Sequence, residues 1–152
     1  MPPEAKKAVL QELTLTNQVP GLLAYIGGQP VGWISIGPRQ SYIALENSRI
    51  LKRIDDTPVW SVVCFFVLKG YRKQKVTLQL LRAALEYARS QGAQAVEGYP
   101  LDMQTPKLAG QKLSGSSGYM GIASVFKEAG FVEVARASET QLIMRYNLKN
   151  QA

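Results

Sequence analysis

A basic turn between an apolar run and a helical pattern is the part of this chain best suited to chemistry. The turn, within residues 65–84, contains four cations: Lys69, Arg72, Lys73 and Lys75. The first N–H groups of a helix lack intrahelical acceptors and the helix dipole is positive there, so phosphate oxygens are favoured at such a position. The nearby cations would strengthen that field. The sequence therefore predicts an anion-binding site where the strand leads into the helix.

The residue types that the chain lacks restrict other kinds of chemistry. It contains no histidine and one cysteine, Cys64, which lies within the apolar run. Without histidine there can be no Ser-His-Asp or Cys-His catalytic system, and no usual zinc site remains, so no metal is expected. A single cysteine excludes an intrachain disulfide, and core packing is the expected role of Cys64. Catalysis would have to use carboxylates, tyrosines, hydroxyls, backbone amides or water.

Length and composition indicate one domain, residues 1–152, of a soluble globular protein. Hydrophobic residues make up 46% of the chain, and the longest apolar stretch, 59–68, has the length of a strand rather than of a membrane span. The N-terminus does not resemble a signal peptide, so a cytoplasmic location is expected. The net charge of +7 would suit a nucleic-acid surface. The cations are dispersed outside the basic turn, however, and no nucleic-acid or membrane partner is expected.

The spacing of apolar residues predicts the elements that must position the basic turn. The predicted helices are 4–15, 75–91 and 119–129, and the predicted strands are 22–26, 31–36, 59–68, 93–100, 131–135 and 141–146. The first two strands form a hairpin, and the near-continuous apolar strand 59–68 is expected to be buried on both faces. Residues 101–118 read as a long loop. This order predicts a mixed α+β fold with a mostly antiparallel sheet and one β-α-β step at its centre.

The basic turn and its flanks resemble the GNAT N-acetyltransferase superfamily. There, a strand leads into the motif Arg/Gln-x-x-Gly-x-Gly/Ala, whose backbone amides hold the diphosphate of acetyl-coenzyme A. The corresponding residues here are Arg72, Lys73, Gln74, Lys75, Val76 and Thr77. Phe126 ahead of Gly130 and Phe131 is similar to a second signature of the superfamily. The likeness spans residues 22–146, is closest to a bacterial branch, and implies a GNAT-like fold with helices on both faces of the sheet.

The resemblance also implies a reaction, in which an amine attacks the thioester of acetyl-coenzyme A directly and takes the acetyl group. The acceptor would be a small molecule or an N-terminal amine. Glu97 is the candidate general base, and Tyr119 or Tyr99 could protonate the leaving thiolate. A salt-bridged role for Glu97 and a packing role for each tyrosine stay open. The implied cofactor-binding residues are Phe65, Phe66, Val67, Arg72, Lys73, Gln74, Lys75, Val76 and Thr77.

Three features depart from the superfamily's pattern. Lys75 and Thr77 stand where small residues are usual, and a left-handed Lys75 would be strained by about 1–2 kcal/mol. Phe126 replaces a tyrosine that often protonates the thiolate. These two departures favour an alternative, a degenerate relative that binds coenzyme A or acts as a regulatory module without catalysis. Third, no residues are left for the superfamily's usual first strand, so strand 22–26 would lie at an open sheet edge, which predicts a homodimer.

Overall fold

The computed structural model describes residues 21–72, 75–110 and 120–148 of the chain. The predicted helix 4–15 lies outside these residues. The strands are β1 (Gly21–Ile26), β2 (Gln29–Pro38), β3 (Trp60–Val67), β4 (Ala95–Gly98), β5 (Val132–Arg136) and β6 (Leu142–Asn147). The helices are α2 (Ile43–Glu46), α3 (Val76–Ser90) and α4 (Ala123–Glu128), with short 3-10 turns η1 (Arg39–Ser41) and η2 (Lys69–Tyr71).

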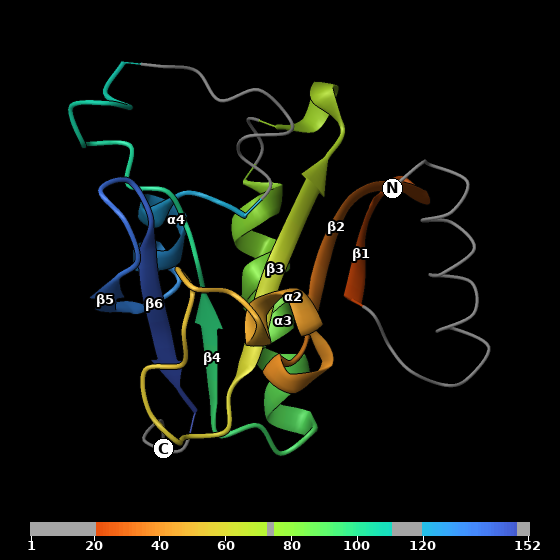
Figure 1. The fold of residues 1–152 in the computed structure, drawn as a ribbon. Helices are drawn as coiled ribbons and strands as arrows, with labels where there is room; N and C mark the ends of the chain where they lie inside the picture. Colours follow the sequence, from red (N-terminus) through yellow and green to blue (C-terminus); the bar gives the residue numbers. More distant parts are fainter. Residues whose placement is uncertain (1–20, 73–74, 111–119, 149–152) are drawn as a thin grey trace.

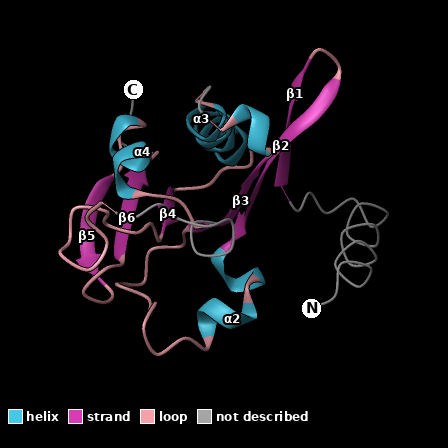
Figure 2. Cartoon of the chain, turned by 90° about the horizontal axis from the view of Figure 1, so that it is seen from above, coloured by secondary structure: helices cyan, strands magenta, loops and turns pink. Residues whose placement is uncertain are grey.

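The strands form one sheet in the order β1-β2-β3-β4-β6-β5 (Figure 1). Only β3 and β4 pair in parallel, and the other neighbouring strands are antiparallel. A parallel pair needs a long crossover connection, and α3 supplies it between β3 and β4. Figure 2 shows α3 and α4 on one side of the sheet and α2 on the other. The predicted α+β fold, with its central β-α-β step and helices on both faces, is confirmed.

Helix α3 forms because its apolar residues recur on one face, which packs against the sheet. The buried members of this face include Val76, Leu80, Leu81, Ala84, Leu85 and Ala88. Gly32 of β2 lies beneath the first turn of α3, where an added Cβ would come within 3.0 Å of the Val76 side chain. The glycine thus permits a close approach between helix and sheet. The helix ends before Gly92, the predicted stop, whose φ of 81° suits glycine at this position.

The structure corrects several details of the predicted elements. Strand β3 is not buried on both faces, because α3 covers only one of them and Phe66 on the other face is 54% exposed. Helix α4 begins at Ala123 instead of residue 119, because Ile122 is extended and Gly121 has a φ of 92°. Strand β4 is limited to four residues. Cys64 is half-buried and does not belong to the buried core.

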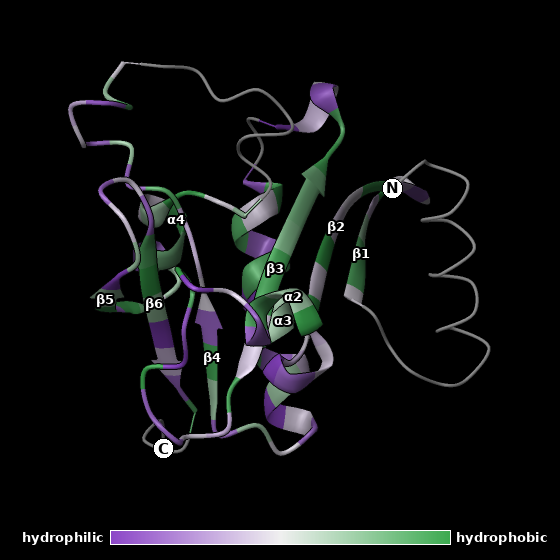
Figure 3. Cartoon of the chain, viewed as in Figure 1, coloured by the Kyte–Doolittle hydropathy of each residue, from purple (hydrophilic) through white to green (hydrophobic). Residues whose placement is uncertain are grey.

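Apolar side chains are concentrated between the sheet and helices α3 and α4. Figure 3 shows strongly hydrophobic residues along β3 and the upper part of β6. The buried residues of α3 belong to the same core. A smaller cluster on the α2 side contains Leu45, Tyr99 and Ile143. Among the described residues, no helix combines the length and the apolar character that crossing a bilayer would require.

Candidate functional site

Strands β3 and β4 separate near the middle of the sheet (Figure 1). Their parallel pairing runs only from Trp60 opposite Val96 to Val62 opposite Gly98. At the same point the register of β3 with β2 shifts, so that Val63 is an extra residue in a β-bulge. A bulge bends its strand and increases its twist, which turns the rest of β3 away from β4. We call the region between residues 63–67 and 98–101 the fork.

The backbone of β3 directs groups toward the fork that have no partner strand there. Leu68 donates its N–H to the carbonyl of Val31 on β2, over 2.9 Å. Hydrogen-bonded and non-hydrogen-bonded positions alternate in an antiparallel ladder, so Phe66 also directs its N–H and C=O toward β2. Phe65 and Val67 therefore direct theirs toward the fork, where β4 no longer pairs. Of the three strand residues predicted to bind the cofactor through their backbone, this geometry favours Phe65 and Val67 and disfavours Phe66.

The opposite side of the fork is occupied by another backbone segment. Leu101, just beyond β4, donates its N–H to the carbonyl of Gly121 over 3.0 Å and accepts a hydrogen bond from Ala123 over 2.9 Å. The rings of Phe65 and Phe126 meet edge to face, with centroids 5.9 Å apart, in the core beside α3 and α4. Phe126 thus has a packing role. Only the β3 side of the fork retains backbone edge groups directed toward it in the described residues.

Helix α3 begins close to the end of β3, and its first amides have no intrahelical acceptor among the described residues. Its first intrahelical bond runs from the N–H of Gln79 to the carbonyl of Lys75, over 3.1 Å, and no side chain caps the helix. The N–H groups of Val76 and Thr77, together with that of Leu78, precede this bond and have no intrahelical partner. Lys75 itself is left-handed, with φ 59° and ψ 25°, as its place in the motif predicts.

The described cations of the basic turn differ in their contacts. Arg72 donates from Nε to the carbonyl of Val67 over 3.1 Å, which ties the turn to the end of β3. Lys75 Nζ lies 3.2 Å from Glu128 Oε1 on α4, so its side chain extends toward α4. Lys69 is exposed in η2. Lys73 and Gln74 lie outside the described residues, so their predicted contacts with the cofactor stay predictions.

Glu97 occupies a buried ion-pair network on the α2 side of the sheet. Its side chain is 2% exposed, and its Oε2 accepts hydrogen bonds from Nη2 and Nε of Arg145 over 2.6 and 3.0 Å. The Tyr99 hydroxyl lies 3.4 Å from Oε1. Arg145 also forms a bidentate pair with Asp55, and its hydrogen bonds hold the pKa of Asp55 at about 2. The salt-bridged alternative for Glu97 is thus observed, and its catalytic role stays a prediction.

The hydroxyl of Tyr99 joins this network to the end of β2. It accepts a hydrogen bond from Arg39 Nη1 over 3.0 Å and lies 2.8 Å from Ser61 Oγ. Burial raises the pKa of Tyr99 to about 12, so the phenol keeps its proton at physiological pH. Arg39 is buried and also pairs with Glu46 over 3.0 Å. Tyr99 is therefore buried and hydrogen-bonded, in keeping with the packing role that the sequence left open. Tyr119, the other candidate acid, lies outside the described residues.

Sequence reasoning assigned no role to Arg39 or Arg145, although both are buried. For Arg145 a signal was present, since it is the one charged residue in the strand sequence LIMRYN. A charged side chain within an otherwise buried strand requires a charged or hydrogen-bonding partner. The partners themselves come from distant parts of the chain, and no local pattern identifies them.

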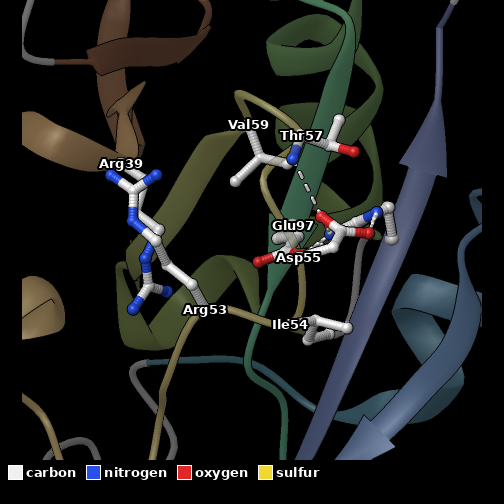
Figure 4. A pocket seen from close by; sticks show the side chains of 8 residues that line it. Arg39, Arg53, Ile54, Asp55, Thr57, Val59 and Glu97 are labelled. Carbon is white, nitrogen blue, oxygen red and sulfur yellow. Dashed lines mark hydrogen bonds and ion pairs between the residues drawn. The ribbon is translucent and has the colours of Figure 1, made fainter.

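A small hollow lies beside this network (Figure 4). Its lining includes Arg39, Arg53, Asp55, Glu97 and Arg145. Arg39 and Arg53 both form ion pairs with Glu46. Arg145 forms ion pairs with Asp55 and Glu97. Each of these five charged side chains thus has a partner of opposite charge. Asp55 also stabilises the local turn, because its Oδ1 accepts a hydrogen bond of 3.0 Å from the N–H of Thr57. Within the described ranges no three potential metal ligands gather.

Comparisons with solved structures find the same fold. A ribosomal-protein-alanine N-acetyltransferase from Brucella melitensis is 20% identical, with a TM-score of 0.59 over 97% of this chain and 80% of that one. The yncA protein of Salmonella typhimurium, solved with acetyl-CoA, is 14% identical, with a TM-score of 0.62 over 100% of this chain and 77% of that one. The NatC complex bound to Gag peptide and CoA contains a chain that is 10% identical, with a TM-score of 0.56 over 95% of this chain and 79% of that one. At these identities the likeness establishes the fold alone.

The family is established by the sequence match. No curated protein matches the chain. The sequence profile of the Acetyltransferase (GNAT) family matches residues 2–100. That match includes the β3 side of the fork, the basic turn and the whole of α3. The predicted resemblance is therefore confirmed, and the chain belongs to the GNAT acetyltransferase family.

Proposed function

We propose that this protein is an N-acetyltransferase that takes its acetyl group from acetyl-CoA. The observation that carries the proposal is that two sets of backbone groups, neither paired within a strand ladder or a helix, lie close together in the chain and in the fold. One set is the β3 edge at Phe65 and Val67, and the other is the start of α3 at Val76 and Thr77. An extended amide-containing arm can add to an open strand edge, and a diphosphate is favoured at a helix start.

The residues present fit acetyl-CoA. At Phe65 the backbone N–H and C=O are both directed to the fork, and neither has a partner on β4. At Val67 the carbonyl already accepts from Arg72, which leaves its N–H for an added arm. The Lys75 side chain extends toward Glu128, and the helix start is uncapped. These residues would bind and orient the cofactor without metal.

Acetyl-CoA supplies an activated carbonyl, which the acceptor amine attacks as the bond to sulfur breaks. The amine loses a proton in this reaction, and a base must accept it. We propose that Glu97 accepts this proton, either directly or at the end of a path that runs through Ser61 and Tyr99. The hydroxyl chain from Ser61 to Tyr99 to Glu97 supports this route, with separations of 2.8 and 3.4 Å. Tyr119 is the proposed acid for the leaving thiolate.

Cofactor binding is tested first, by thermal unfolding with and without acetyl-CoA. A ligand that binds the native state raises the midpoint of unfolding, by an amount that grows with ligand concentration. We expect a clear rise for the native sequence and a smaller one for Arg72→Glu, which brings a carboxylate to the diphosphate site. Arg82→Glu on α3 is the matched control, with an unchanged rise. An absent rise at millimolar acetyl-CoA would refute the proposed function.

The role of Glu97 is tested by the pH dependence of turnover. Glu97→Gln removes the carboxylate, so we expect acetylation to fall more at neutral pH than at alkaline pH, where more of the acceptor amine is already unprotonated. Thiol release from acetyl-CoA with a panel of amines provides the assay. Turnover that falls equally at every pH would leave Glu97 only its structural role beside Arg145.

The proposed acceptor is a primary amine, either on a small molecule or at the N-terminus of a peptide. Two structures of similar fold support including peptides, because one is named a ribosomal-protein-alanine N-acetyltransferase and another holds a Gag peptide. We further propose, on the sequence argument alone, that the protein acts in the cytoplasm. The second candidate function is binding of coenzyme A without catalysis. Phe126, buried where a tyrosine is usual, favours it, and a thermal shift without thiol release would identify it.

A further inference from the structure

One ion pair joins the start of α3 to α4, beside the proposed diphosphate site. Lys75 Nζ and Glu128 Oε1 are 3.2 Å apart and come from positions 53 residues apart in the chain. The two side chains are 72% and 49% exposed. An exposed pair of this kind is weak, because water screens it and two flexible side chains must be ordered. The pair can therefore be broken at little cost when Lys75 meets a stronger partner.

A diphosphate at the start of α3 would be such a partner. It carries more than one negative charge, whereas Glu128 carries one. The N–H groups of Val76 and Thr77, which have no intrahelical acceptor, would hold it close to Lys75. Glu128 acts in the opposite direction. Its carboxylate competes for the Lys75 ammonium and repels an anion bound nearby. The two residues thus have opposed effects on any phosphate-bearing ligand at this helix start.

We propose that Lys75 exchanges Glu128 for the diphosphate when coenzyme A binds, so that Glu128 sets the affinity for the cofactor by competition. This inference rests on the proposed function and makes it more specific: the ammonium of Lys75 binds phosphate, and Glu128 is its counter-ion in the resting protein. Lys75 stands where the family usually has glycine, and its positive charge compensates for the larger side chain by attracting the diphosphate. The exposed pair is weak enough for the exchange to occur. Because salt screens exposed charges, the effect of Glu128 on the affinity for coenzyme A should decrease as the ionic strength rises.

Calorimetric titration with coenzyme A measures the exchange without any turnover. Glu128→Gln frees Lys75, and we expect about two- to fivefold tighter binding at low salt, the range that one exposed charge produces at this separation. Lys75→Gln should weaken binding to a similar degree. In the double variant the gain from Glu128→Gln should shrink, because there is no ammonium left to free. An equal gain with and without Lys75 would mean simple repulsion and would overturn the exchange.

Two controls distinguish the exchange of partners from a general charge effect and from an effect that does not involve the diphosphate. Glu86→Gln removes the same charge from an exposed pair with Arg89 on α3, about 15 Å farther along the helix, and should leave affinity unchanged. Pantetheine, which lacks the diphosphate, should bind the native protein and Glu128→Gln equally. If pantetheine instead gains as much as coenzyme A, the effect of Glu128 does not depend on the diphosphate and the exchange is wrong. If the native protein binds coenzyme A but Glu128→Gln changes nothing, only this inference fails.

Discussion

Lys75 has a backbone conformation that glycine adopts more readily than any other residue. At a φ of 59° its Cβ crowds the following carbonyl, which costs about 1–2 kcal/mol. The exposed pair with Glu128 offsets little of that cost. The compensation must come chiefly from packing, because Val76, the next residue, is buried against Gly32 and fixes the first turn of α3 on the sheet.

This strain is measurable by comparing two substitutions at position 75. Lys75→Gly and Lys75→Ala both remove the ammonium and the pair with Glu128, so their difference isolates the backbone. We expect the glycine variant to be more stable than the alanine variant by about 1 kcal/mol, since glycine tolerates a positive φ and alanine does not. Urea unfolding of the two variants gives the difference in free energy. Equal stabilities would contradict a left-handed residue 75.

Some single-residue properties could be predicted from the sequence and others could not. The motif predicted the place of Lys75 at the helix start, because strand, turn and helix are contiguous in the chain. The burial of Glu97 could not be predicted, because its partner Arg145 is 48 residues away in the chain. Arg145 also pairs with Asp55, which is 90 residues away from it. Contacts of this kind depend on the final sheet order.

The approach of α4 to β4 depends on a glycine. Gly98 lies directly against Phe126, and a Cβ at this position would overlap the edge of the ring. The ring is also held by Phe131, with centroids 4.9 Å apart, so it has no free space into which to move. The same glycine ends the pairing of β4 with β3 and thereby lies at the base of the fork.

We expect Gly98→Ala to lower the free energy of unfolding by about 1–3 kcal/mol, because a well-packed core resists added atoms. Gly70→Ala is the matched control: nothing lies within 4 Å of an added Cβ there, so its effect should be near zero. Chemical denaturation measures both. Adding Phe126→Leu to Gly98→Ala should recover part of the loss. If Gly98→Ala is as stable as the control, the close contact between α4 and β4 is wrong.

At the element scale, regular local patterns were sufficient for the hairpin, β3 and α3. They were not sufficient for the fork. It results from the bulge at Val63 and from the segment at Ile122 that pairs beside β4, and both involve chain segments distant in sequence. Phe66 illustrates the same limit, because its apolar character suggested burial while the uncovered face of β3 leaves it exposed.

The two outer strands of the sheet differ in how well they are protected against pairing with another molecule. Strand β5 carries Glu133 and Arg136, and charged residues discourage added strands at an edge. Strand β1, with the sequence GLLAYI, has no charge, and Leu23 and Tyr25 are 51% and 59% exposed. Within the described residues β1 pairs only with β2. The β1 edge is therefore the better candidate for self-association.

The predicted homodimer can be tested at this edge. Because β1 is apolar and pairs only with β2 among the described residues, we expect the native protein to sediment as a dimer. Leu23→Lys with Tyr25→Lys should sediment as a monomer through charge repulsion. Ile43→Lys with Ile50→Lys adds the same two charges at exposed positions outside the sheet and should leave the dimer intact. Strand β2 separates β1 from β3, so binding of coenzyme A should persist in the monomer. A native protein that sediments only as a monomer would refute the dimer and leave the fork's proposed chemistry unaffected.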